Sequence, residues 1–147
     1  MVDQSNPSDE ALLRQLIERQ QRSICAGDID SVMALYKEDA IIFDVKPPYQ
    51  TSGSGAIRQL WEDCMPGHSS PLKVETRDMT LTTGGKLAFA HWLWRFTGLD
   101  ETHPAMQTWI RTTGTYRKDG DRWLIVHEHS SVPFDPETGR ALFTLNP

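Results

Sequence analysis

Two histidines near the end of the chain are the residues whose chemistry is easiest to name. The segment Arg122–Ser131 has the composition of a β-strand, and alternation along a strand places His127 and His129 on one face beside Trp123. Imidazoles titrate near neutral pH, so at one end of an apolar pocket they could move protons or bind a ligand. The spacing of the two histidines also permits metal binding, but the motif offers no third ligand and we expect no metal.

Three more cationic or titratable side chains lie on the two preceding predicted strands. His91 and Arg95 share one face of a strand, and Arg111 shares a face of the next strand with Trp109. If these side chains point into a pocket, the pocket is cationic and suits a carboxylate, enolate or phenolate ligand. If they point outward, they are surface residues or contacts within a dimer.

Asp44 is the candidate general base, because it ends the first predicted strand just before a Pro-rich loop. A carboxylate on the wall of an apolar pocket can have a raised pKa and accept a proton, whereas the alternative role is a cap for the loop. Tyr36 on the second predicted helix could offer its phenol to the same pocket, and Trp61 on the third could line it; the alternative for both is a place in the core. Glu128 is expected to face away from the histidines and to form a salt bridge with a neighbouring strand.

The chain is predicted to consist of helices followed by a sheet, which is the α+β pattern. The predicted elements are a helix from Asn6 or Ser8 to Gly27, a second from Asp28 to Tyr36, a third from Ser54 to Cys64, and strands at Ala40–Phe43, Leu72–Thr82, Leu87–Gly98, Met106–Arg117 and Arg122–Ser131. A long, mostly antiparallel sheet should curve strongly around the helices and leave a conical pocket open at one end. The tail after Pro133 is expected to be irregular.

Length and charge limit what the protein can be. The 147 residues suit one domain, and 15 basic against 20 acidic residues give a net charge of −5, which argues against a nucleic-acid-binding surface. The sequence shows no membrane-spanning run, signal peptide, dinucleotide fingerprint or Walker motif, so we expect a cytoplasmic protein that needs no cofactor. Cys25 and Cys64 form no CxxC pair and are expected to be free, buried thiols.

Short motifs along nearly the whole chain carry a family resemblance. They are Ala26–Asp30 between the first two helices, Asp39–Asp44 leading to Pro47-Pro48, Gly55–Ile57 with Trp61, His91 with Arg95, Trp109–Arg111 and Trp123–Phe134. With these motifs the chain resembles the nuclear transport factor 2-like superfamily, in its SnoaL-like, ketosteroid-isomerase-like branch, and is also similar to the calcium/calmodulin-dependent kinase II association domain. The resemblance implies a cystatin-like roll with a conical pocket. It also implies a homodimer formed through the sheet, which would cover a long face that carries several tryptophans.

The resemblance implies two kinds of function. In isomerase members an Asp moves a proton next to a ketone while a Tyr and a protonated Asp bind the oxyanion; Asp44 lies near the position of the first carboxylate, and the late strands carry histidines in place of a second Asp. We therefore expect a small-molecule-binding protein that acts as a cofactor-independent isomerase or lyase on an enolisable carbonyl. The alternative is a non-catalytic module that binds a ligand such as a carboxylate or assembles an oligomer. The expected catalytic residues are Asp44, His91 and His129, and the expected ligand-binding residues are Tyr36, Trp61, Arg95, Trp109, Arg111 and His127.

Overall fold

The long first helix begins and ends at the residues that its capping signals predict. In the computed structural model, which describes residues 7–65, 71–100, 102 and 106–147, helix α1 spans Asp9–Ala26. The Ser8 hydroxyl accepts a hydrogen bond from the Ala11 amide (3.2 Å), and Gly27 ends the helix in the left-handed conformation (φ 68°). The other expected cap, Asn6, lies outside the described residues. The buried face of α1 is formed by Leu13, Leu16, Ile17, Gln20, Ser23 and Ile24.

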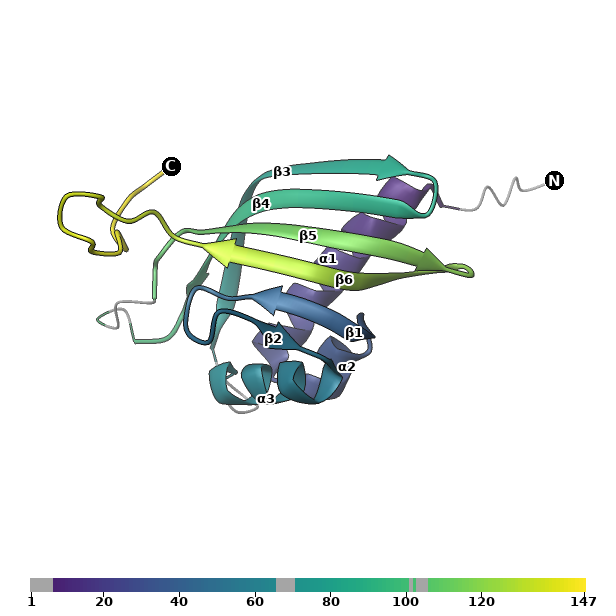
Figure 1. Cartoon of the computed structure of the whole chain (residues 1–147), viewed down its shortest axis with the longest axis horizontal. Coiled ribbons are helices and arrows are strands. Elements are labelled where there is room, and N and C mark those ends of the chain that lie inside the picture. The colour runs from purple at the N-terminus through teal and green to yellow at the C-terminus, as the bar shows by residue number, and fades with distance from the viewer. Residues whose placement is uncertain (1–6, 66–70, 101, 103–105) are drawn as a thin grey trace.

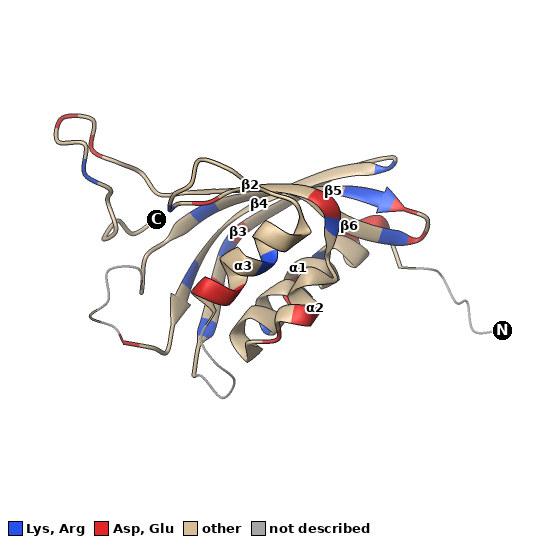
Figure 2. Cartoon of the chain, turned by 60° about the horizontal axis from the view of Figure 1, so that its bottom comes forward, with Lys and Arg blue, Asp and Glu red and all other residues tan. Residues whose placement is uncertain are grey.

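One mixed sheet curves around α1. Its six strands lie in the order β2-β1-β6-β5-β4-β3, and each neighbouring pair is antiparallel except β1 with β6. The strands are β1 (Tyr36–Phe43), β2 (Thr51–Ser52), β3 (Lys73–Gly84), β4 (Leu87–Thr97), β5 (Ile110–Asp119) and β6 (Arg122–Ser131). The shorter helices α2 (Ile29–Met33) and α3 (Ser54–Cys64) lie with α1 on the same side of the sheet (Figures 1 and 2). The predicted α+β fold with a curved, mostly antiparallel sheet is confirmed.

Some element boundaries differ from the prediction. Tyr36 opens β1 instead of ending the second helix, because its backbone pairs with Ile125 of β6 and the Ile125 amide donates to the Leu35 carbonyl (2.8 Å). Pairing between these distant segments overrides the local helical spacing. The sequence does not predict β2, since two residues are too few to show alternation, and β5 begins later than expected, at Ile110. The predicted stop of α3 at Pro66-Gly67 lies outside the described residues.

A β-bulge at Val126 interrupts the pairing of β6 with β5. Tyr116 of β5 pairs with Ile125, whereas the preceding residue Thr115 pairs with His127, so Val126 is one extra residue on β6. An extra residue shifts the alternation of side chains by one position, and each residue after it changes face. Strict alternation therefore describes β6 only as far as the bulge.

The bulge reverses the predicted placement of the last strand's side chains. Glu128 and Ser130 join Trp123 on the inner face of the sheet, where Glu128 is buried and both line a cavity. His127 and His129 face outward, away from the helices. The prediction that the two histidines lie beside Trp123 is wrong for this reason. Glu128 does face away from the histidines, but it is buried and hydrogen-bonded to uncharged groups instead of forming a salt bridge.

The large aromatic side chains of β4 lie on the inner face of the sheet. Trp92 and Trp94 are 2% and 6% exposed, and their rings lie edge to face with centroids 6.2 Å apart. The outer face exposes smaller apolar residues instead, with Leu87 and Phe89 53% and 44% accessible to solvent. The tryptophans on which the expected dimer depends are thus buried within a single protomer.

Candidate functional site

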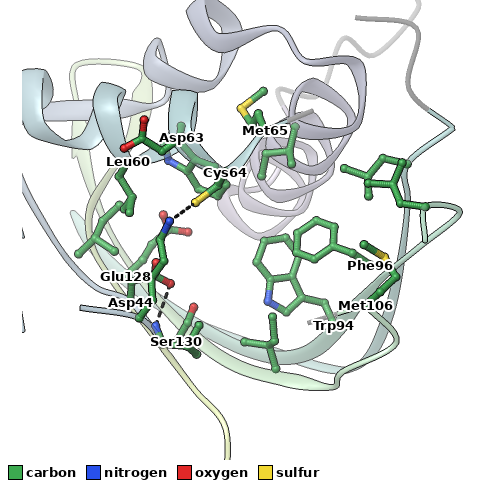
Figure 3. A pocket seen from close by; sticks show the side chains of 18 of the residues that line it. Asp44, Leu60, Asp63, Cys64, Met65, Trp94, Phe96, Met106, Glu128 and Ser130 are labelled. Carbon is green, nitrogen blue, oxygen red and sulfur yellow. Dashed lines mark hydrogen bonds between the residues drawn. The ribbon is translucent and has the colours of Figure 1, made fainter. Parts of the chain in front are cut away.

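A cavity of about 670 Å³ lies between the inner face of the sheet, α1 and α3. Figure 3 shows Trp94 and Phe96 on one side of it and Asp44, Glu128 and Ser130 gathered on the other. An apolar cavity with a few polar groups on one wall is the usual form of a small-molecule site. The apolar residues that line it are Ile24, Ile42, Val45, Leu60, Trp61, Met65, Leu72, Trp94, Phe96, Leu99, Met106 and Ile110.

Glu128 is a carboxyl group held almost entirely out of water on the cavity wall. The Tyr36 hydroxyl donates a hydrogen bond to Glu128 Oε1, and Gln20 Nε2 donates to Oε2 (3.0 Å). Trp61 Nε1 and Gln20 Nε2 both donate to the Tyr36 oxygen (3.2 and 3.1 Å), so the phenolic hydrogen is directed to the carboxyl group. Burial raises the pKa of Glu128, against the hydrogen bonds from Tyr36 and Gln20, which favour the charged form.

A second buried phenol lies beside this carboxyl group. Gly114 is the partner of Glu128 in the β5–β6 pairing, and a side chain at position 114 would collide with the Tyr116 hydroxyl. That hydroxyl makes no hydrogen bond with the part of the chain that the structure describes. Burial, together with the charge of Glu128, raises the pKa of Tyr116 well above its usual value. The glycine therefore allows the Tyr116 ring to lie across the sheet toward Glu128.

Asp44 lies at the end of β1, and its half-buried carboxyl group lines the same cavity. The Val45 amide donates a hydrogen bond to Asp44 Oδ1 (2.8 Å). Burial raises the pKa of Asp44, while this hydrogen bond and the charge of Lys46 act in the opposite direction. The structure thus gives Asp44 both positions that the sequence allows, on the pocket wall and as a cap for the following loop.

Two exposed residues of the cavity lining, Lys46 and Cys64, are in contact. Lys46 Nζ donates to Cys64 Sγ (2.7 Å), and this hydrogen bond, with smaller contributions from the charges of Asp44 and Asp63, raises the pKa of Lys46. Cys64 is free and exposed, which corrects the prediction of a buried thiol. Cys25 is also free and is partly buried, and burial raises the pKa of its thiol.

The histidines and arginines expected in the pocket lie on the outer face of the sheet. His127 is half-buried, with Nδ1 2.8 Å from the Ile41 carbonyl oxygen, and His129 is exposed beside the Phe43 ring at a centroid distance of 5.5 Å. The bulge puts these two outside. Regular alternation puts the others outside, because Trp92 and Trp94 on β4 and Thr112 on β5 take the inner positions. The prediction that these side chains point into the pocket is therefore wrong for His91, Arg95, Arg111, His127 and His129.

The arginines and Trp109 interact with one another and with their neighbours on this outer side. Arg95 forms an ion pair with Glu75 (2.7 Å), and its guanidinium carbon lies 4.8 Å from the centroid of the Trp109 ring. Arg111 Nε donates to Ser131 Oγ (3.1 Å). Trp109 is buried by these contacts but does not line the cavity. The predicted site residues that the structure does bring to the cavity, on its wall or directly behind it, are Asp44, Tyr36 and Trp61.

Sequence reasoning missed Glu128 and Gln20 as site residues. A signal for Gln20 was present, because it occupies the helical face formed by Leu13, Ile17 and Ile24, where a polar side chain must find a buried partner. For Glu128 no local signal exists, since its face depends on the bulge. Its buried position follows only from the pairing of β6 with β5.

The described residues contain no group of three or more His, Cys, Asp or Glu side chains that could hold a metal ion. His127 and His129 share the outer face with ring centroids 6.5 Å apart, without a third such ligand among the described residues. Separately, no helix within the described ranges has the length and apolar character needed to cross a membrane.

Comparison with known proteins agrees with this architecture. The chain is similar to a nuclear transport factor 2-like protein of unknown function from Pseudomonas putida, with 38% identity and a TM-score of 0.84 over 97% of this chain and 100% of that one. A proposed ketosteroid isomerase from Parabacteroides distasonis shares 14% identity and a TM-score of 0.67 over 88% of this chain and 91% of its own. A proposed calcium/calmodulin-dependent protein kinase type II association domain from Thiobacillus denitrificans shares 20% identity and a TM-score of 0.67 over 88% of this chain and 97% of its own. These last two show the fold alone. The family model of the SnoaL-like domain matches residues 13–135, and the chain belongs to this family.

Proposed function

We propose that this protein binds an apolar small molecule with an enolisable carbonyl and moves a proton next to that carbonyl, as an isomerase or lyase without a cofactor. The observation that carries the proposal is the pair of carboxyl groups on one wall of an otherwise apolar cavity. Asp44 and Glu128 both line it, and their surroundings differ. Two titratable groups in unlike environments can take the separate roles of base and acid.

Glu128 is suited to the acid role. It is buried, its pKa is raised, and the neutral carboxyl form can donate a hydrogen bond to a carbonyl oxygen as negative charge develops there. Tyr36 and Gln20 fix the orientation of the carboxyl group, since they contact both of its oxygens. A carboxyl group held in this way can stabilise the negative charge on the substrate oxygen without the reorganisation that water would need.

Asp44 is suited to the base role. It is half-buried, whereas Glu128 is buried, and the Val45 amide and the charge of Lys46 favour its charged form, which is the form that accepts a proton. The resemblance to isomerases supports this assignment, because those proteins use a carboxylate from the same region to take the proton. Here a glutamic acid with a supporting tyrosine replaces the oxyanion-binding pair of those enzymes.

Hydrogen exchange at the α-carbon of a ketone tests the reaction directly. We expect the protein to accelerate deuterium uptake by 2-tetralone in D2O, followed by NMR. Asp44→Asn should lower the accelerated rate by about 10²–10⁴-fold, since it removes the general base. Asp39→Asn is the matched control, because Asp39 is an exposed carboxylate of β1 away from the cavity. Exchange at the buffer rate, or equal rates in wild type and Asp44→Asn, would reject the proposal.

A homodimer is a separate proposal, which now depends on the outer sheet face. Leu87 and Phe89 are the large apolar residues exposed at the β4 end of this face, and a second copy packed on them would remove them from water. Sedimentation at micromolar concentration tests the pairing. Sedimentation as a monomer would reject the homodimer proposal. A large oligomer together with no turnover of any ketone would favour the assembly function over catalysis.

A further inference from the structure

The charged side chains that line the cavity are mostly acidic. Its described lining contains Lys46 as the single basic residue, against four carboxyl groups, which are Asp44, Asp63, Asp100 and Glu128. If Glu128 is protonated, as its proposed role requires, three carboxylates still face one ammonium group. An anionic ligand in this space would be repelled most by the half-buried Asp44, and less by Asp63 and Asp100, which are exposed to solvent.

Lys46 offsets only one of these charges, and its ammonium group is already engaged. Its Nζ donates to Cys64 Sγ at 2.7 Å, and the charges of Asp44 and Asp63 act on it. Using Lys46 to bind an anion would require it to leave these partners. The cations that could have bound a carboxylate, such as Arg111, lie on the opposite face of the sheet, beyond its backbone.

The apolar wall opposite the carboxyl groups is aromatic. Trp94 and Phe96 line it with ring centroids 5.0 Å apart, while Trp61 lines the cavity on the side of Glu128, where its indole donates to Tyr36. The face of an aromatic ring carries partial negative charge and attracts organic cations, most strongly for tryptophan. Figure 3 shows Trp94 and Phe96 across the cavity from Asp44 and Glu128, so a bound cation would have carboxyl groups on one side and rings on the other.

We infer that the cavity selects ligands by charge and prefers an apolar molecule with a positively charged amine over its neutral analogue, and both over its anionic analogue. The inference rests on the proposed function only in assuming that this cavity is the ligand site, and it adds the substrate class: an apolar amine, which for the proposed reaction also carries the carbonyl. Four carboxyl groups and an aromatic wall in the same cavity support it together.

Three ligands of nearly equal shape separate charge from size. We would measure the binding of 2-naphthylmethylammonium, 2-naphthylmethanol and 2-naphthoate by isothermal titration calorimetry at pH 7. The ammonium compound should bind roughly tenfold more tightly than the alcohol, and the carboxylate should bind more weakly than the alcohol. Asp44→Asn should reduce the ratio between the ammonium compound and the alcohol, while Asp39→Asn, which changes the net charge equally, should leave that ratio unchanged.

The results that overturn the inference differ from those that overturn the proposed reaction. Tighter binding of the carboxylate, a ratio that Asp44→Asn leaves unchanged, or no binding of any of the three compounds at millimolar concentration would each reject charge selection. The expected order with no ketone exchange would keep the inference and reject the reaction. Ketone exchange with the reverse order would keep the reaction and reject the inference.

Discussion

On the inner face of the sheet Trp92, Trp94 and Glu128 are buried, whereas on the outer face His91 and Arg111 are exposed to solvent. On the inner face a carboxyl group is buried among hydrogen-bond donors, and its pKa is raised by burial. On the outer face the charged groups keep contact with solvent or with opposite charges, as in the ion pair of Arg95 with Glu75. The same strands thus line an apolar cavity, whose charged groups are mostly acidic, on one side and present a basic, imidazole-rich surface on the other.

This difference shows how strongly the chemistry of a sheet depends on register. If alternation continued unbroken through Val126, with no bulge, His127 would point inward and Glu128 outward. The cavity wall would then carry imidazoles in place of the buried carboxyl group of Glu128. One bulge therefore decides which of these titratable groups lies on the cavity wall.

The largest expected difference between the two faces is in the free energy of unfolding when one aromatic residue of each face is replaced. Trp92→Ala should lower the free energy of unfolding by about 3–5 kcal/mol, because it leaves a void in the core, whereas Phe89→Ala should cost at most about 1 kcal/mol. Trp92 is 2% exposed and Phe89 is 44% exposed. Urea denaturation measures both. An equal loss for the two variants would mean that the outer face is also covered, as it would be in a stable dimer.

Replacing one polar residue on each face should give a smaller difference in the free energy of unfolding, in the same direction. Tyr36→Phe should cost about 1–3 kcal/mol, because it removes the hydroxyl that donates to Glu128 and accepts from Gln20 and Trp61. Arg111→Gln on the outer face should change the free energy of unfolding by no more than about 0.5 kcal/mol, since its side chain is exposed. Thermal unfolding with a calorimeter gives both values. Equal costs would contradict the buried network as a source of stability.

The smallest effect is a change in pH dependence. Burial raises the pKa of Glu128 in the folded protein above its unfolded value, so its contribution to stability is fully present below the unfolded pKa and is lost as the pH rises through the folded pKa. Glu128→Gln should therefore gain stability relative to wild type when the pH is raised from 5 to 8. Urea midpoints at the two pH values measure this, and parallel curves for wild type and Glu128→Gln would show that Glu128 does not titrate in this range.

Much of the fold follows from local patterns in the sequence. Ser8 and Gly27 mark the ends of α1, the spacing of Leu13, Ile17 and Ile24 marks its buried face, and the alternation along Leu87–Thr97 marks β4 as a strand without showing which face is the inner one. These signals depend on residues close in the chain, so a helix or strand can be predicted before its neighbours are known.

The site could be predicted only in part. Asp44 and Trp61 were expected at the pocket and do line it, because each lies on an element whose boundary the sequence marks well. Tyr36 reaches the site from a strand and not from the expected helix, since its backbone pairs with Ile125. Gln20 carried a readable signal, a polar residue on an apolar helical face, but its partner Glu128 is distant in sequence.

Local patterns in the amino-acid sequence are enough to predict the class of fold, the helical hairpin, the long strands and the chemical groups available to a pocket. The tertiary structure decided which of those groups enter the cavity, because that choice depends on how β6 pairs with β5 and β1. A side chain's face is fixed by alternation only while pairing stays regular, and the extra residue at Val126 is defined by its partners on another strand. For that reason the sequence shows that both imidazoles and a carboxyl group stand at the end of the last strand, and only the folded chain shows that the carboxyl group of Glu128 is the one inside.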